Sequence, residues 1–147
     1  MIKWMVMDAH KRIKSHGYRL TRQRKVVLEV LSDHPGRPLN PADVHRLASE
    51  KMPGIGLTTV YRTLELLSEL GIVLRVHLHE EAQHYELNTG EHHHHLVCLS
   101  CRSILPYRGC DLEELEERVR DESDFLVTSH CLSIFGYCGE CLAAARG

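Results

Sequence analysis

Four cysteines in two close pairs constrain this 147-residue chain more than any other feature of its sequence. The pairs are Cys98-x-x-Cys101 and Cys138-x-x-Cys141, and 36 residues separate them. A Cys-x-x-Cys pair places two thiolates on one turn, so two pairs can supply all four tetrahedral ligands of a closed structural zinc site. Clustered cysteines in a reducing cytosol bind metal more often than they form disulfides. We therefore predict a structural Zn²⁺ site here; redox-active thiols are the alternative.

Charge and metal-binding residues are distributed unevenly along the chain. Residues 1–75 contain 13 Lys and Arg against 7 Asp and Glu, whereas residues 76–147 contain 5 against 13. All six cysteines lie after residue 97; Cys110 and Cys131 have no partner at a close spacing, and we expect each to be a buried structural thiol. A basic half favours contact with nucleic-acid phosphates, although chance segregation on a solvated surface is the alternative. No apolar run is long enough for a signal peptide or a membrane span, which predicts a cytoplasmic protein.

The first half of the chain predicts a series of short helices. A first helix covers about residues 8–16, and Thr21 and Asn40 have the side chains that begin the second and third helices. A fourth helix runs from about Thr58 to Leu70, where Gly71 ends it. Alternating apolar residues then predict a β-hairpin. Helices followed by a hairpin are typical of a winged helix-turn-helix.

The second half predicts a different, mixed structure. Residues 88–91 have the composition of a linker. After them we expect strands at 96–98 and 103–107, a helix capped by Asp111, and a closing strand region at 125–136. The predicted fold class is therefore α+β, with an N-terminal winged helix-turn-helix followed by a small α/β domain that carries the four-cysteine zinc site.

Four consecutive histidines, at positions 92–95, lead directly into a predicted strand. Because alternate side chains of an extended chain face opposite sides, His93 and His95 point one way and His92 and His94 the other. One run can therefore supply ligands to two different metal sites. A nonspecific metal-binding surface is the alternative.

Acidic residues and one further histidine could complete these two sites. Glu86, on the hairpin, could join His93 and His95, while Glu113 and His130 could join the other pair. This mixture of nitrogen and oxygen ligands suits a divalent ion such as iron, manganese, zinc or nickel. Such a site holds its ion more loosely than four thiolates do, and a sensor requires an exchangeable ion.

The predicted fourth helix carries side chains that suit DNA recognition. If Val60 and Leu64 face the core, Thr58 and Arg62 lie near the opposite face, with Tyr61 beside them. Arg62 can pair with guanine or phosphate, and the Tyr61 ring can pack on a thymine methyl group. Basic residues also cluster around the start of the second helix, at Arg19, Arg22, Arg24 and Lys25. Solvated charge is the alternative for each of them.

Together these motifs resemble the ferric uptake regulator (Fur) family. The matching segments are residues 18–24, 56–62, 92–101 and 138–141, so the resemblance covers nearly the whole chain. It implies a homodimeric winged-helix transcription regulator, usually a repressor of metal-uptake or stress genes, that binds AT-rich inverted repeats of DNA. It also implies a DNA-binding domain at residues 1–87, a hinge at 88–91, and a dimerisation and metal-binding domain at 92–147.

The resemblance implies roles for individual residues. The structural zinc ligands correspond to Cys98, Cys101, Cys138 and Cys141. The regulatory metal site at the hinge corresponds to Glu86, His93 and His95. An additional site in the dimerisation domain corresponds to His92, His94, Glu113 and His130. The DNA contacts correspond to Arg19, Thr58, Thr59, Tyr61 and Arg62.

Two positions depart from the family's pattern. Pro38 and Pro106 stand where iron and peroxide sensors have a histidine and an acidic ligand, and a proline side chain cannot bind metal. The hinge site thus retains three of its usual ligands, and water or one of three hairpin histidines could replace the others: His77, His79 or His84. Iron(II) remains the expected sensed ion because it is the most frequent in the family; zinc, manganese and nickel are alternatives.

Two other classes of function are weighed against a regulator. His84-Tyr85-Glu86 followed by Cys-x-x-Cys is similar to a zinc deaminase motif, but that chemistry needs a proline where Val97 precedes the first cysteine. Four thiolates also close the zinc to substrate, so we expect no enzymatic activity. A metal-storage or chaperone protein is the remaining alternative. It would bind several ions and show no preference for DNA.

Overall fold

Short polar side chains begin the second and third helices of the chain. The computed structural model describes residues 2–78 and 82–147, so His79 lies outside the described residues. At the start of α2 (Arg22–Ser32) the Thr21 hydroxyl accepts a hydrogen bond from the Arg24 N–H at 3.3 Å. At the start of α3 (Pro41–Lys51) the Asn40 side chain accepts one from the Asp43 N–H at 2.8 Å. Each bond satisfies an N–H that has no partner inside the helix, and both predicted caps are confirmed.

Glycines in the left-handed region end the first and fourth helices. Gly17 (φ 80°) follows α1 (Ile2–Ser15), and Gly71 (φ 68°) follows α4 (Leu57–Glu69). After α4, the Gly71 N–H donates to the Ser68 carbonyl at 3.0 Å and the Ile72 N–H to the Leu67 carbonyl at 2.9 Å. These paired bonds are a Schellman motif, which satisfies the last carbonyls of the helix and turns the chain into the hairpin.

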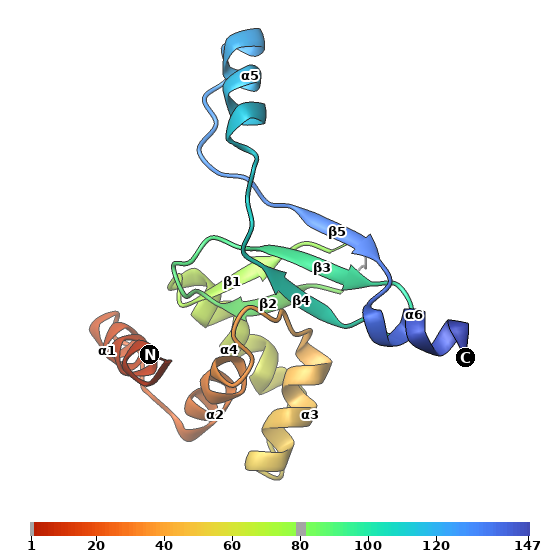
Figure 1. The fold of residues 1–147 in the computed structure, drawn as a ribbon. Helices are drawn as coiled ribbons and strands as arrows, with labels where there is room; N and C mark the ends of the chain where they lie inside the picture. Colours follow the sequence, from red (N-terminus) through yellow and green to blue (C-terminus); the bar gives the residue numbers. More distant parts are fainter. Residues whose placement is uncertain (1, 79–81) are drawn as a thin grey trace. The chain divides into compact units, whose positions relative to one another are not determined.

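A backbone segment outside the hairpin also pairs with it, which the sequence did not predict. Strands β1 (Val73–Val76) and β2 (His84–Leu87) pair antiparallel. Leu39 forms an additional bridge, since its N–H and carbonyl each hydrogen-bond to the backbone of Tyr85 at 2.8 Å. The winged helix-turn-helix is therefore confirmed, with the residue before the Asn40 cap added to its wing (Figure 1).

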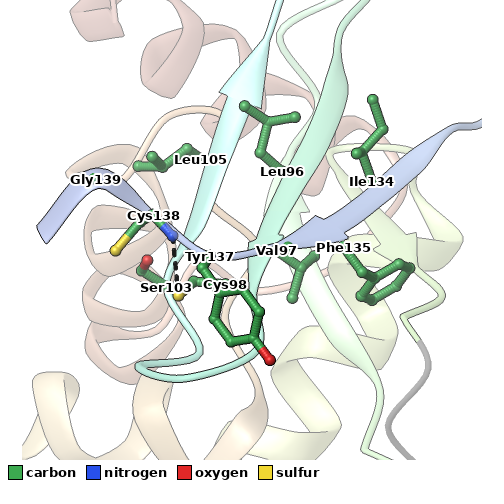
Figure 2. Close-up of a pocket in the computed structure, with 11 residues that line it drawn as sticks. Leu96, Val97, Cys98, Ser103, Leu105, Ile134, Phe135, Tyr137, Cys138 and Gly139 are labelled. Carbon is green, nitrogen blue, oxygen red and sulfur yellow. Dashed lines mark hydrogen bonds between the residues drawn. The ribbon is translucent and has the colours of Figure 1, made fainter. Parts of the chain in front are cut away.

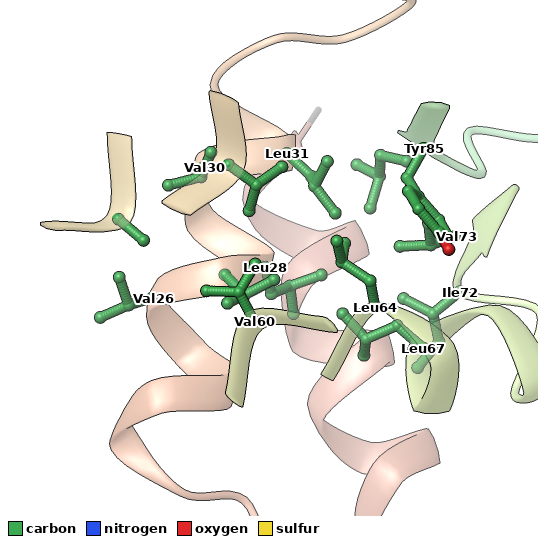
Figure 3. Packing of buried hydrophobic residues seen from close by; sticks show 14 of the residues in the cluster. Val26, Leu28, Val30, Leu31, Val60, Leu64, Leu67, Ile72, Val73 and Tyr85 are labelled. Carbon is green, nitrogen blue, oxygen red and sulfur yellow. The ribbon is translucent and has the colours of Figure 1, made fainter. Parts of the chain in front are cut away.

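The first unit is held together by an apolar core. By its internal contacts the chain divides into two compact units, Met1–Glu91 and His92–Gly147. In the first unit all four helices and the hairpin contribute side chains to one buried cluster, part of which Figure 3 shows. Leu28, Leu64 and Leu67 have no exposed surface. Full burial of one leucine side chain contributes about 1.5–3 kcal/mol, so this unit has a large hydrophobic driving force of its own.

The second unit is a three-stranded sheet with two helices (Figure 1). The sheet order is β4-β3-β5: β3 (His94–Cys98) pairs antiparallel with β4 (Ile104–Tyr107) and parallel with β5 (Ser133–Gly136). Helix α5 (Glu113–Ser123) connects β4 to β5, and α6 (Gly139–Arg146) follows β5. The predicted strands at 96–98 and 103–107 are thereby confirmed, each within one or two residues of its observed bounds.

Three details of the second unit differ from the sequence-based prediction. Asp111 does not cap α5, whose first flanking residue is Leu112 and which has no side-chain cap. Only the last four residues of the predicted closing segment form a strand. Helix α6 was not predicted at all. None of the described residues of α5 or α6 is buried, and no described helix is long and apolar enough to cross a membrane.

Candidate metal centres and DNA-contact helix

The four paired cysteines meet at one end of the three-stranded sheet. Cys98 is the last residue of β3, Cys101 follows in the turn to β4, Cys138 directly precedes α6, and Cys141 lies in its first turn. Their sulfur atoms all lie within 4.8 Å of one another. Figure 2 shows Cys98 and Cys138 joined by a hydrogen bond, in which the Cys138 N–H donates to the Cys98 sulfur at 3.3 Å. Parallel pairing of β3 with β5 is what aligns the two pairs.

The spacing of these sulfurs suits a tetrahedral zinc ion. The Cys101 and Cys138 sulfurs are 3.8 Å apart. Zinc–sulfur bonds of about 2.3 Å in a tetrahedron place two sulfurs about 3.8 Å apart. The residues therefore fit a four-thiolate zinc site, which would have no open position for a substrate.

Hydrogen bonds and neighbouring thiols shift the pKa of three of these cysteines. Backbone N–H groups, that of Cys138 foremost, lower the pKa of Cys98 to about 6. The hydrogen bond with the Ser103 hydroxyl lowers the pKa of Cys101. A hydrogen bond with Ser100 lowers the pKa of Cys141, but the neighbouring thiols outweigh it and raise the value to about 11. Four thiolates so close together repel one another, and a divalent cation would remove that repulsion.

A second group of possible ligands lies in the same unit, beside the start of β3. It consists of His92, His94, Cys110 and His130, whose ligand atoms lie within 4.8 Å of one another. The Nε2 atom of His130 is 2.9 Å from the Nε2 atom of His92 and 3.2 Å from the Cys110 sulfur. On the other side of its ring, His130 Nδ1 is 2.5 Å from an oxygen of Glu116.

This group differs from the predicted additional site. The three histidines come together as the alternation predicted, but the fourth member is Cys110 rather than Glu113. Helix α5 begins at Glu113, and it is Glu116, one turn later, that reaches His130. Cys110 is partly buried and Cys131 is exposed, so the prediction that both are buried thiols is wrong. The sequence signal that was missed is Cys110 itself, which has no local partner and meets the histidines only through the fold.

His94 is the most enclosed member of the group. Its side chain is 1% exposed, and within the described residues neither ring nitrogen has a hydrogen-bond partner. Burial lowers the pKa of His94, and the nearby histidines, His92 and His130 foremost, lower it further. The ring is therefore held neutral, which is the form that binds a metal ion.

The predicted regulatory residues are divided between the two units. Glu86 lies on β2 of the first unit, opposite Leu74. His93 and His95 lie side by side in the second unit, with ring centroids 5.0 Å apart. Pro106 lies directly opposite His95 across β3 and β4, so an acidic residue at that position would have had its side chain beside this imidazole. The three-residue regulatory site remains a prediction.

Helix α4 presents the predicted DNA-contact residues on its outer face. Thr58, Tyr61 and Arg62 are exposed, Tyr61 by 46%, and Thr59 is partly buried. The opposite face buries Val60 and Leu64 completely. Arg19 is exposed in the loop before α2, where its carbonyl accepts a hydrogen bond from Arg24. These side chains are free to approach DNA, and their roles as contacts remain predictions.

Three other histidines of the first unit lie within hydrogen-bonding distance of backbone carbonyls. His34 Nδ1 is 2.8 Å from the Val30 carbonyl, and His45 Nε2 is 2.9 Å from the Ile55 carbonyl. Of the hairpin histidines, His77 is exposed, and His84 Nδ1 is 3.0 Å from the carbonyl of Ala82. An imidazole bound to a backbone carbonyl must carry its proton there, which leaves only its other nitrogen as a ligand.

Comparison with known proteins gives one consistent result. The sequence model of the "Ferric uptake regulator family" matches residues 15–135. The ferric uptake regulation protein of Bacillus subtilis is 37% identical over 134 residues, which covers 89% of this chain and 90% of the relative. The protein of the same name from Neisseria gonorrhoeae is 30% identical over 134 residues, with coverage of 91% and 93%.

Solved structures agree with the sequence relatives. The Helicobacter pylori ferric uptake regulator, whose structure is described as revealing three functional metal binding sites, matches with a TM-score of 0.80 at 25% identity, covering 97% of this chain and 94% of that one. A zinc-bound manganese uptake regulator matches with a TM-score of 0.74 at 28% identity, covering 88% and 98%. The winged helix, the paired cysteines and the histidine run thus occur together in a chain that belongs to the ferric uptake regulator family of metal-responsive transcription regulators.

Proposed function

We propose that this protein is a homodimeric repressor that binds DNA in response to a divalent metal, with iron(II) as its first candidate ion. The observation that carries the proposal is that Tyr61 and Arg62 are exposed on the outer face of α4, while the opposite face of this helix is buried in the core. The N-terminus of this helix and its exposed Arg62 are suited to phosphates and base edges. The relatives named as ferric uptake regulation proteins support iron as the first candidate.

Zinc at the four cysteines would hold the second unit in its folded form. The sulfur spacing and the acidity of Cys98 both favour a resident cation there. The exposed apolar side chains of the second unit, among them Phe125 and Leu126, suit the interface of a homodimer. A two-fold dimer reads an inverted repeat, with recognition helices about one DNA turn apart, roughly 34 Å.

The sensed ion would act at the hinge. In this proposal Glu86 from the wing and His93 and His95 from the second unit hold one ion between them. Such an ion favours the DNA-binding arrangement only to the extent that it binds that arrangement more tightly than the others. Iron(II), manganese(II), zinc(II) and nickel(II) all accept these ligands, so affinity for the metal alone does not identify the sensed ion.

The test is DNA binding by the zinc-loaded full chain at one fixed salt concentration. A labelled AT-rich inverted repeat and a scrambled duplex are titrated with protein, without oxygen, in the presence of each of the four ions separately. We expect specific binding with iron(II) and its loss when His93 and His95 are both replaced by alanine. Metal-dependent binding that persists unchanged in this variant would refute the hinge site.

A second variant tests whether helix α4 contacts DNA. Arg62→Ala should weaken binding to the specific duplex by about tenfold or more, as expected for the loss of one base contact. Arg118→Ala removes an exposed arginine from α5 and serves as the matched control, which should bind as the wild type does. A protein that takes up several ions but binds both duplexes equally would instead be a metal store.

A further inference from the structure

Three imidazoles and one thiol converge beside the start of β3, in a combination that the family resemblance did not assign. We propose that His92, His94, Cys110 and His130 form a second zinc site, in which the Cys110 thiolate is the fourth ligand in place of the Glu113 carboxylate. This goes beyond the proposed function, because it concerns the ligands and the ion of this site and not the response of DNA binding to metal.

The ligand atoms already lie close to the positions that a tetrahedral ion would require. With zinc–nitrogen bonds of about 2.05 Å and zinc–sulfur bonds of about 2.3 Å, two nitrogens lie about 3.3 Å apart and a nitrogen and a sulfur about 3.6 Å apart. The observed separations are 2.9 Å between the His130 and His92 nitrogens and 3.2 Å between His130 and the Cys110 sulfur. A shift of a few tenths of an ångström brings these three atoms to bonding distance of one ion.

His94 supplies an independent sign that a ligand is required. Its ring is buried at 1% exposure, and no described residue offers a hydrogen bond to either nitrogen. A buried polar group without a partner destabilises the folded state, and nearly all such groups in folded proteins are satisfied. His92 and His130 both pack against this ring, with centroids 4.7 and 5.2 Å away, so its nitrogens lie within the same cluster.

Glu116 orients one of the ligands from outside the site. The His130 Nδ1–H donates to the Glu116 carboxylate at 2.5 Å, which leaves the lone pair of Nε2 directed at His92 and Cys110. Metal-binding histidines commonly donate their second N–H to a carboxylate in this way, and the bond raises their basicity. Glu116 is thus a positioning residue.

The ligand set selects the class of ion. One thiolate with three neutral imidazoles is a borderline-soft, four-coordinate set that suits zinc, whereas manganese favours carboxylate and water oxygens. Four protein ligands leave no open position, so the site is structural. On binding the ion, the Cys110 thiol releases its proton to solvent.

The position of the site indicates what it stabilises. Cys110 lies in the loop before α5 and His130 in the segment after it, while His94 lies on β3. Helix α5 has no buried residue of its own to fix it to the sheet. An ion shared by Cys110, His130 and His94 would hold the segments on both sides of α5 against β3. It would thereby take the place of the apolar contacts that α5 lacks.

Cobalt(II) is the probe that tests the thiolate, because sulfur bonded to cobalt gives a charge-transfer absorption band that imidazole and carboxylate do not give. The full chain is first loaded with one equivalent of zinc and then titrated with cobalt(II), while a zinc-sensitive dye reports any zinc that leaves the four-cysteine site. We expect the absorption band to rise as cobalt(II) supplies the second equivalent of metal, and we expect no zinc to be released from the four-cysteine site. Cys131→Ser, which removes the exposed neighbouring cysteine, should behave as the wild type does.

Four variants test which residues bind or orient the ion. Cys110→Ser should abolish the band, and Cys110→Asp should abolish it while still binding one cobalt ion, which guards against a variant that fails to fold. Glu113→Gln should change neither the band nor the affinity. Glu116→Ala should keep the band and weaken the affinity about 10- to 100-fold.

Several outcomes would overturn the inference. A band of wild-type intensity in Cys110→Ser would mean that this thiol is not a ligand. Loss of cobalt binding in Glu113→Gln with normal binding in Cys110→Ser would restore the carboxylate as the fourth ligand. Displacement of the bound cobalt by iron(II) or manganese(II) as readily as by zinc would refute the proposed ion. Since none of these measurements involves DNA, a failed DNA-binding test leaves them unaffected, and the reverse also holds.

Discussion

The two units of this chain are stabilised by different means. Residues 1–91 contain a continuous cluster of buried apolar side chains to which every helix of the unit contributes. In residues 92–147 the only apolar residue that is buried among those described is Cys98, itself a candidate metal ligand. Two clusters of sulfur and nitrogen ligands take the place of a core there. The difference indicates that hydrophobic burial folds the first unit, and we expect metal ions and a partner surface to stabilise the second.

Size explains why the second unit needs this help. A segment of 56 residues gains only marginal stability from its own core, and small domains commonly add disulfides, metals or a partner chain. Large apolar side chains of this unit remain exposed, among them Leu126 at 76% and Phe125 at 62%. Exposed apolar groups of this size are typical of surfaces that another chain covers.

The largest expected effect is the loss of a zinc ligand. Cys138→Ser should unfold the second unit and leave the first unit folded, because structural zinc sites contribute roughly 10–16 kcal/mol of apparent binding free energy to the folded state. Amide hydrogen exchange of the full chain, resolved by peptide, measures both units at once. Peptides from β3 and β5 should lose their protection, whereas peptides from α2 and α4 should keep it.

Cys131→Ser is the control for this variant, since it removes an exposed cysteine from the same unit. It should leave the exchange pattern unchanged. If α2 and α4 lost protection together with β3 in Cys138→Ser, the two units would form one cooperative structure and the contrast between them would fail.

The next largest effect belongs to the core of the first unit. Leu64→Ala should lower the free energy of unfolding of this unit by about 2–5 kcal/mol, because Leu64 has no exposed surface and its loss leaves a cavity. Urea unfolding, followed by hydrogen exchange in α2, measures the change. Zinc content should stay at the wild-type value.

Leu57→Ala serves as the matched control on the same helix, since Leu57 is 44% exposed. It should change the stability by no more than about 0.5 kcal/mol. A loss of bound zinc in Leu64→Ala would show that the core of the first unit also stabilises the second, and would contradict their separate stabilisation.

Local signals in the sequence predicted most of the first unit. The Thr21 and Asn40 caps and the Gly71 stop act over three or four residues, so the sequence alone was enough to place them. The bridge from Leu39 to Tyr85 was missed, because it joins residues far apart in the chain and Leu39 has no strand pattern around it.

The candidate sites show the same division between local and distant information. The two Cys-x-x-Cys pairs are local motifs, and the fold brings them together as predicted. The choice of Cys110 over Glu113 depended on where α5 begins and on the path of residues 124–132, which have no regular structure. Neither feature leaves a periodic pattern in the sequence.

The smallest effect concerns a histidine that serves no metal site. Burial lowers the pKa of His10 below its usual value of 6.5, and the nearby Lys25 and Lys14 lower it further, while Glu29 opposes them. As pH falls below 6.5, the unfolded chain takes up this proton before the folded chain does. The contribution of neutral His10 to stability is thus present above pH 6.5 and is lost as pH falls through the lowered value.

His10→Gln cannot take up this proton, so its first unit should lose less stability between pH 7.5 and pH 5 than that of the wild type. The difference between the two proteins, measured by urea unfolding at each pH, cancels the other titrating groups. His16→Gln removes an exposed imidazole just beyond the same helix and controls for the substitution. A difference of the opposite sign would mean that folding favours the charged form of His10. In that case the first unit would favour a charged histidine, whereas we expect both units to favour neutral imidazoles: a partly buried one on α1 in the first unit and metal ligands in the second.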